Sequence, residues 1–150
     1  MILALVISIL FLDQLTKFLV TKTLTLNHSI PVIKGIFHLT LTYNRGAAFG
    51  LLKGKVPFFI FTSLVAVLLI YLELKNNKFK KFSAYNISLG LILAGGIGNL
   101  IDRLFFGYVI DFLDFRIWPV FNLADSAITV GAILLGWSVL IKKKNKKCIP

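Results

Sequence analysis

The amino-acid sequence predicts a membrane all-α fold, with four transmembrane helices and a small extracytoplasmic β-sheet in the first outer loop. Of its 150 residues, 57% are hydrophobic and the mean hydropathy is +0.86, more apolar than is usual for a soluble domain of this size. The apolar residues are concentrated in four runs, at 1–20, 56–72, 82–101 and 117–141. We expect a single integral membrane domain, residues 1–150, with an outer β-rich loop at about 21–55.

Each run is close to the ~20 residues that a helix needs to cross about 30 Å of hydrocarbon. Backbone groups in lipid must find partners within the chain, so helices are expected. The first run has no basic N-terminal region and contains Asp13 and Lys17, which favours a retained helix over a cleaved signal peptide. These two residues are four apart and can pair on one helix face. We expect the pair to be structural and to fix the helix end near the membrane boundary.

The first outer loop contains a strand signature. Residues 37–43 alternate apolar and polar side chains. Pro31 and Gly35 precede this stretch, and Gly46 and Gly50 follow it, so turns are expected at both ends. The interpretation is a small sheet that lies on the membrane surface.

The basic residues predict the orientation in the membrane. The net charge is +11, and the charges gather at the ends of apolar runs, which favours lipid headgroups over nucleic acid as the partner. Four lysines lie within 75–81 and five within 142–147, and four spans put both stretches on the side of the N-terminus. The opposite side has six basic residues spread over longer loops. Both termini are therefore predicted to be cytoplasmic.

Three acidic residues border the third and fourth runs: Asp102, Asp111 and Asp125. Ionisable residues at membrane depth are costly and usually functional. Asp102 shares one helical face with Asn99 and Arg103, and we expect Arg103 to be its ion-pair or hydrogen-bond partner.

Asp111 has apolar neighbours, and Asp125 lies early in the fourth run. The 13 residues between them, 112–124, can bring the two carboxylates face to face. Two such groups held close share one proton, so one acts as base and the other as acid in the activation of water. From spacing alone, Asp125 could equally complete a helix cap with Asn122, and Asp111 could be bonded to backbone amides. Spacing does not choose among the three aspartates.

Other interpretations have weaker support. A small transporter or channel subunit could use Asp111 and Asp125 as ion or proton ligands. His28 and His38 have no cysteine or acidic residue in their loop, so no zinc site is expected there. Asp114 is expected to face solvent. Four glycines of the third run are expected to serve helix packing: Gly90, Gly95, Gly96 and Gly98.

Five blocks of the sequence stand out: DQLTK at 13–17, YNRGAAFG at 43–50, GNLIDR at 98–103, GYVIDF at 107–112 and FNLADS at 121–126. In this order they resemble the signatures of the bacterial lipoprotein signal peptidases, the signal peptidase II family. The resemblance covers nearly the whole chain, although the stretch 112–124 is shorter than is common in that family.

The resemblance implies that Asp111 and Asp125 are the catalytic pair. It implies that Arg103 and Asn44 bond the substrate backbone, or the antibiotic globomycin, and that Asn99 and Asn122 orient the pair and its water. The residues implied in substrate binding or in support of the pair are Asn44, Gly46, Asn99, Asp102, Arg103, Asn122 and Ala124.

The resemblance also implies the substrate, a diacylglyceryl-modified prolipoprotein that is cut just before its lipidated cysteine. Such an enzyme works in the bacterial cytoplasmic membrane, without metal or organic cofactor. The substrate would enter sideways from the bilayer, with its signal helix among the spans.

Overall fold

Four helices and three strands make up the computed structural model, which describes residues 1–46, 54–76 and 83–147. The predicted turn at Gly50 and the lysines at 78, 80 and 81 lie outside the described residues. The elements, in chain order, are α1 (Ile2–Thr23), β1 (Ser29–Ile33), β2 (Phe37–Asn44), α2 (Val56–Asn76), α3 (Ala84–Phe106), β3 (Val109–Asp114) and α4 (Leu123–Lys147).

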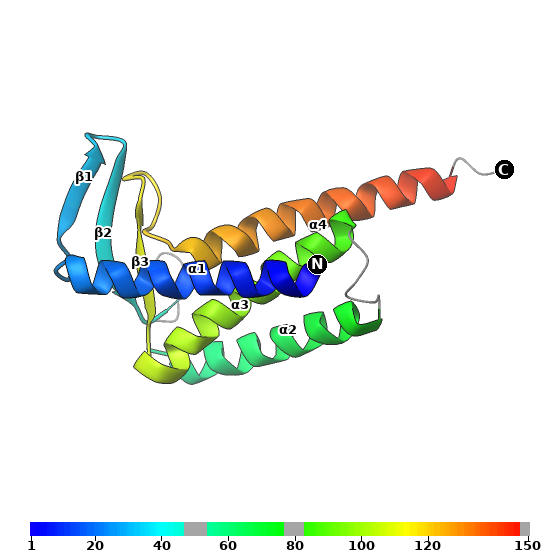
Figure 1. The fold of residues 1–150 in the computed structure, drawn as a ribbon, viewed down its shortest axis with the longest axis horizontal. Helices are drawn as coiled ribbons and strands as arrows, with labels where there is room; N and C mark the ends of the chain where they lie inside the picture. The colour runs from blue at the N-terminus through cyan, green and yellow to red at the C-terminus, as the bar shows by residue number, and fades with distance from the viewer. Residues whose placement is uncertain (47–53, 77–82, 148–150) are drawn as a thin grey trace.

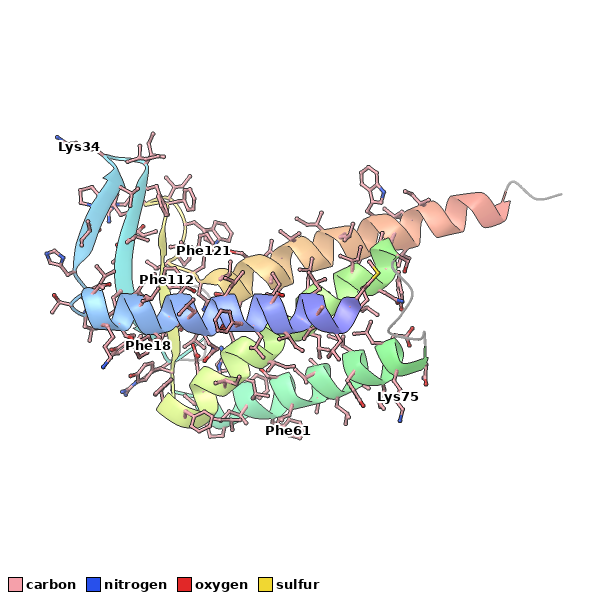
Figure 2. All side chains as sticks on the ribbon, in the orientation of Figure 1. Phe18, Lys34, Phe61, Lys75, Phe112 and Phe121 are labelled. Carbon is pink, nitrogen blue, oxygen red and sulfur yellow. The ribbon has the colours of Figure 1, made fainter. Side chains whose placement is uncertain are left out.

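The helices form a bundle, and the sheet lies across one end of it (Figure 1). All four are long and apolar enough to cross a membrane, which confirms the predicted spans. The start of α1 and the end of α4 lie at the end of the bundle away from the sheet. Lys34 lies at the tip of the sheet and Lys75 at the opposite end (Figure 2).

Helix α3 lies at the centre of the bundle, in contact with α1, α2 and α4. Its glycines allow the close approach. A Cβ at Gly98 would lie 2.5 Å from Oδ2 of Asp13, and a Cβ at Gly95 would overlap the carbonyl oxygen of Ala124. The side chains of Ile2 and Val67 lie against Gly90 and Gly96 in the same way. The packing role predicted for the four glycines is confirmed.

The ends of the last two spans differ from the prediction. Helix α3 continues past Ile101 to Phe106, because it ends only at Gly107, whose φ of 75° is left-handed and whose N–H bonds the Arg103 carbonyl. Helix α4 begins at Leu123 rather than near Ile117. The extension of α3 brings Asp102 and Arg103 into the helix.

The sheet has a third strand that the sequence did not reveal. The strand order is β1-β2-β3, antiparallel throughout, and β3 comes from the stretch after α3 rather than from the first outer loop. Four consecutive residues of β3, 109–112, are buried, so the strand has no apolar–polar alternation to identify it. In the register of β2 with β3, Thr42 faces Asp111 and Asn44 faces Val109. This pairing brings Asp111 to the block around Asn44.

Candidate active site

A buried lysine lies where α1 meets α3. Lys17 is 2% exposed, and its Nζ lies 2.9 Å from Oδ2 of Asp13 and 2.9 Å from Oδ2 of Asp102. The predicted Asp13–Lys17 pair is confirmed, but it is buried between helices rather than fixing a helix end at the membrane boundary. The expected Asp102–Arg103 ion pair is wrong. Adjacent residues of a helix point in different directions, and Asp102 faces Lys17 instead.

The two aspartates around Lys17 also bind the main chain of other elements. Oδ1 of Asp13 accepts the N–H of Ala124 at 2.9 Å, at the start of α4. Oδ2 of Asp102 accepts the N–H of Ile110 at 3.1 Å, in β3. Both amides belong to the residue that immediately precedes a predicted catalytic aspartate. The cluster therefore ties α1 and α3 to β3 and α4.

Asp111 lies on β3 with its side chain buried, 1% exposed. Its Oδ2 accepts a hydrogen bond from Nδ2 of Asn44 at 3.0 Å, and its Oδ1 accepts one from Nδ2 of Asn122 at 2.7 Å. The partners are therefore side-chain amides rather than the backbone amides considered above. Burial, and next the charge of Asp125, raise the pKa of Asp111 to about 7, although the bonds from Asn44 and Asn122 oppose this shift.

Asp125 lies in the first turn of α4. Its N–H donates to Oδ1 of Asn122 at 2.8 Å, so the predicted helix cap by Asn122 is confirmed. Its carboxylate points elsewhere, and Oδ1 accepts from Nδ2 of Asn99 at 2.7 Å. The cap uses the main chain of Asp125 and leaves its side chain for the site, so the two interpretations are compatible.

Two amide side chains connect the carboxylates of Asp111 and Asp125. Nδ2 of Asn122 lies 2.7 Å from Asp111 and 3.1 Å from Oδ1 of Asn99, and Nδ2 of Asn99 continues the path to Asp125. Asn122 is completely buried and Asn99 is 6% exposed. The structure thus brings the two predicted aspartates into one hydrogen-bonded network.

A cavity of about 290 Å³ opens beside this network. It is near the lower limit of roughly 300 Å³ for ligand pockets. Asp125 lines it, whereas Asp111 is not among its described lining residues and reaches it through Asn44. The lining residues are Asn44, Gly46, Asn99, Arg103, Val109, Trp118, Pro119, Val120, Phe121, Asp125 and Thr129.

The remaining predicted site residues divide into two groups. Gly46 and Arg103 border the cavity. The N–H of Gly46 donates to Oδ1 of Asn44 at 2.9 Å, which turns the Asn44 amine toward Asp111. The guanidinium of Arg103 lies over the Phe59 ring at 5.2 Å and donates to the Asn99 carbonyl at 3.3 Å. Asp102 and Ala124 are completely buried and can act only as support.

The sequence did not single out Gln14. Its Nε2 donates to Oδ2 of Asp13 at 3.1 Å and to Oδ1 of Asp102 at 3.2 Å, so it is a second bridge between the two carboxylates. The sequence did contain a signal for this role, because a polar glutamine inside an apolar run needs hydrogen-bond partners within the protein. Among the described residues, no three histidine, cysteine or acidic side chains are grouped to hold a metal ion.

Asp114 does not face solvent, as had been expected, but is 5% exposed. Its carboxylate accepts from Oγ1 of Thr40 at 2.7 Å and from the N–H of Arg116 at 2.8 Å. Burial opposes ionisation, but these bonds and the Arg116 charge lower the pKa of Asp114. The solvent-facing position was expected because β3 was not predicted. Asp114 is the last residue of β3, and its side chain bonds Thr40 of the neighbouring strand β2.

The fold and the site together define a multi-pass membrane protein with two linked carboxylates beside a cavity at one end of its bundle. The family model of signal peptidase (SPase) II matches residues 5–141. The chain therefore belongs to the signal peptidase II family.

Curated relatives match this chain over nearly their whole length. The chain is 50% identical over 137 residues to the lipoprotein signal peptidase of Halothermothrix orenii, which covers 90% of this chain and 92% of that protein. It is 51% identical over 146 residues to the lipoprotein signal peptidase of Caldanaerobacter subterraneus, with 95% and 97% covered. Membership of a peptidase family confirms the resemblance and disfavours the transporter or channel interpretation.

A solved structure has the same fold. It is described as a bacterial membrane enzyme structure by the in meso method at 2.3 Å resolution. The TM-score is 0.89 and the identity 32%, with 99% of this chain and 93% of the other covered. The chain is thus a bacterial multi-pass membrane peptidase.

The raised pKa of Asp111 predicts how stability depends on pH. Between about pH 4 and about pH 7 the folded protein holds a proton on Asp111 that the unfolded chain has lost, so stability falls as the pH rises through this window. The loss is on the order of a few kcal/mol. We expect Asp111→Asn to lose less stability than the parent from about pH 5 to about pH 8. Thermal unfolding in detergent measures this difference.

The matched control is Asp114→Asn, the same substitution on the same strand. The pKa of Asp114 is lowered, so this carboxylate stays ionised across that range and its removal should leave the pH dependence as in the parent. An equal loss of stability in parent and Asp111→Asn would contradict the prediction.

Proposed function

We propose that the chain is an aspartic-type signal peptidase II in which Asp111 and Asp125 together activate water. The observation that carries the proposal is the path from Asp111 through Asn122 and Asn99 to Asp125, beside a cavity that Asp125 lines. The negative charge of Asp125 is one cause of the raised pKa of Asp111, so the network favours a state in which Asp111 holds a proton and Asp125 is ionised.

The chemistry follows from that shared proton. Asp125 borders the cavity and takes a proton from water, which attacks the scissile carbonyl carbon. The proton already held by the pair goes to the carbonyl oxygen. When the tetrahedral intermediate collapses, the C–N bond breaks and Asp125 gives the proton taken from water to the departing amine. Asp111 takes back the proton of the hydroxyl that becomes the new carbonyl, which restores the pair. The raised pKa of Asp111 supports the presence of the first proton near neutral pH.

The polar lining of the cavity would hold the substrate. Arg103 and Asn44 both border the space and carry N–H donors suited to backbone carbonyls. The same donors would bind a globomycin-type inhibitor. Asn99 and Asn122 would orient the pair, and the Gly46 N–H would fix the Asn44 amide.

The proposed substrate is a diacylglyceryl-modified prolipoprotein, cut before its lipidated cysteine. The relatives are named lipoprotein signal peptidases. An apolar groove of about 520 Å³ adjoins the cavity and shares Trp118, Phe121, Asp125 and Thr129 with it. A substrate with acyl chains in the bilayer could therefore reach Asp125 from the side.

We expect Asp111→Asn and Asp125→Asn each to lower the cleavage rate of a lipidated precursor in detergent by at least about 1,000-fold, because neither variant can hold and transfer the shared proton. Asp102→Asn should lower the rate less than either change, since its carboxylate only supports the pair. Elution as a folded monodisperse protein is the control for each variant. Cleavage at the parental rate by either dyad variant would remove that residue from the mechanism.

We also propose that both termini are cytoplasmic and that the sheet is outside. The charge distribution supports this orientation, because Lys75 and the end of α4, where residues 142–147 include five lysines, lie at the end away from the sheet. The active site would then lie at the outer surface of the membrane.

The single cysteine, Cys148, allows a direct test of orientation. A membrane-impermeant maleimide should label Cys148 in inside-out vesicles and spare it in intact spheroplasts. Lys34→Cys in a Cys148→Ser background is the matched probe for the sheet, and it should be labelled only from outside. The reverse pattern would contradict the proposed orientation.

A further inference from the structure

We infer that Lys17 is a positioning residue for peptide hydrolysis, and that its ammonium group sets the placement of both Asp111 and Asp125. The inference rests on the proposed function. Lys17 is not among the described residues that line the cavity. It would therefore act on the reaction only through other groups.

All three N–H bonds of the ammonium have an acceptor. They point to Oδ2 of Asp13 at 2.9 Å, Oδ2 of Asp102 at 2.9 Å and Oδ1 of Asn99 at 3.1 Å. An ammonium has no more donors to offer. At 2% exposure water does not compete for these bonds, so the position of each acceptor is tied to that of Lys17.

Two of the three acceptors, Asp102 and Asp13, also bind the main chain next to Asp111 and Asp125. Asp102 accepts the N–H of Ile110, one residue before Asp111. Asp13 accepts the N–H of Ala124, one residue before Asp125. Hydrogen bonds from an N–H to a carboxylate are among the stronger ones in proteins. Each catalytic aspartate is therefore only one peptide unit from a group that Lys17 holds.

The third acceptor fixes the orientation of an amide. Asn99 must present its Nδ2 amine to Asp125, because a carboxylate only accepts hydrogen bonds. Its Oδ1 then accepts from both Lys17 and Asn122. Lys17 thereby opposes a flip of the Asn99 amide, which would place its oxygen against the Asp125 carboxylate.

Gln14 explains why the fold can tolerate the loss of Lys17 better than the reaction can. Its amide donates to both Asp13 and Asp102, so a neutral bridge would remain between the two carboxylates. Without the ammonium, the two buried carboxylates would lose the positive charge that offsets their mutual repulsion. Ile110 and Ala124 would shift with them, and displacements of about 1 Å in an active site can lower rates by about 100-fold.

The test compares Lys17→Met with Lys22→Met. Lys22 lies on the same helix but is exposed, over the Phe18 ring at 5.7 Å, so it controls for the loss of a lysine from α1. With a purified lipidated precursor, we expect Lys17→Met to lower kcat by at least about 10-fold and to leave KM within about 3-fold of the parent. Lys22→Met should leave both constants unchanged.

A structural role alone would lower the folded fraction without changing kcat per folded molecule. An unchanged kcat for folded Lys17→Met, or a change confined to KM, would overturn the inference. The parental protein separates this outcome from a failure of the proposed function, because a parent that does not cleave the precursor would remove the function itself.

A second variant applies if Lys17→Met does not fold. Lys17→Met combined with Asp13→Asn removes one positive and one negative charge and keeps a carbonyl oxygen for the Ala124 N–H. This double variant should fold and should still show a kcat at least about 10-fold below the parent. Parental kcat would overturn the inference, as would the failure of both variants to fold.

Discussion

The buried ammonium of Lys17 joins α1 to α3 and, through its acceptors, connects both helices to α4 and β3. In a membrane-spanning bundle an unpaired charge is costly, so Lys17 requires acceptors from other elements, and it finds them on α1 and α3. Those acceptors in turn bind the start of α4 and the strand β3. The contact that joins the helices therefore also brings together the chain segments that carry Asp111 and Asp125.

The sequence predicts the four spans and the Asp13–Lys17 pair because both are local properties. Hydropathy is a property of each run, and the pair lies on one helix face. The third strand and the partner of Asp102 could not be predicted in this way. Strand β3 is buried at four consecutive positions, so it lacks alternation, and Asp102 finds Lys17 across the bundle rather than its neighbour Arg103. The burial of Asp114 was missed for the same reason, since its partner Thr40 lies on another strand.

The site combines structural and chemical roles in the same residues. Asn122 caps α4 through its oxygen and donates to Asp111 through its amine. Spacing could not decide between a capping and a catalytic interpretation of the block at 121–126, because the cap uses the main chain of Asp125 while its side chain borders the cavity. The burial that raises the pKa of Asp111 also makes its ionised form unfavourable in the folded protein, so the stability of the protein falls as the pH rises.

We propose that Asp111 and Asp125 hold one proton between them during hydrolysis, and the pH dependence of kcat/KM is the measurement that decides this. For the free enzyme this ratio should fall about 10-fold per pH unit above about pH 7, as the pair loses the proton that it supplies to the carbonyl oxygen. A ratio that stays constant from about pH 6 to about pH 9, with the lipidated precursor unchanged over that range, would contradict the shared proton.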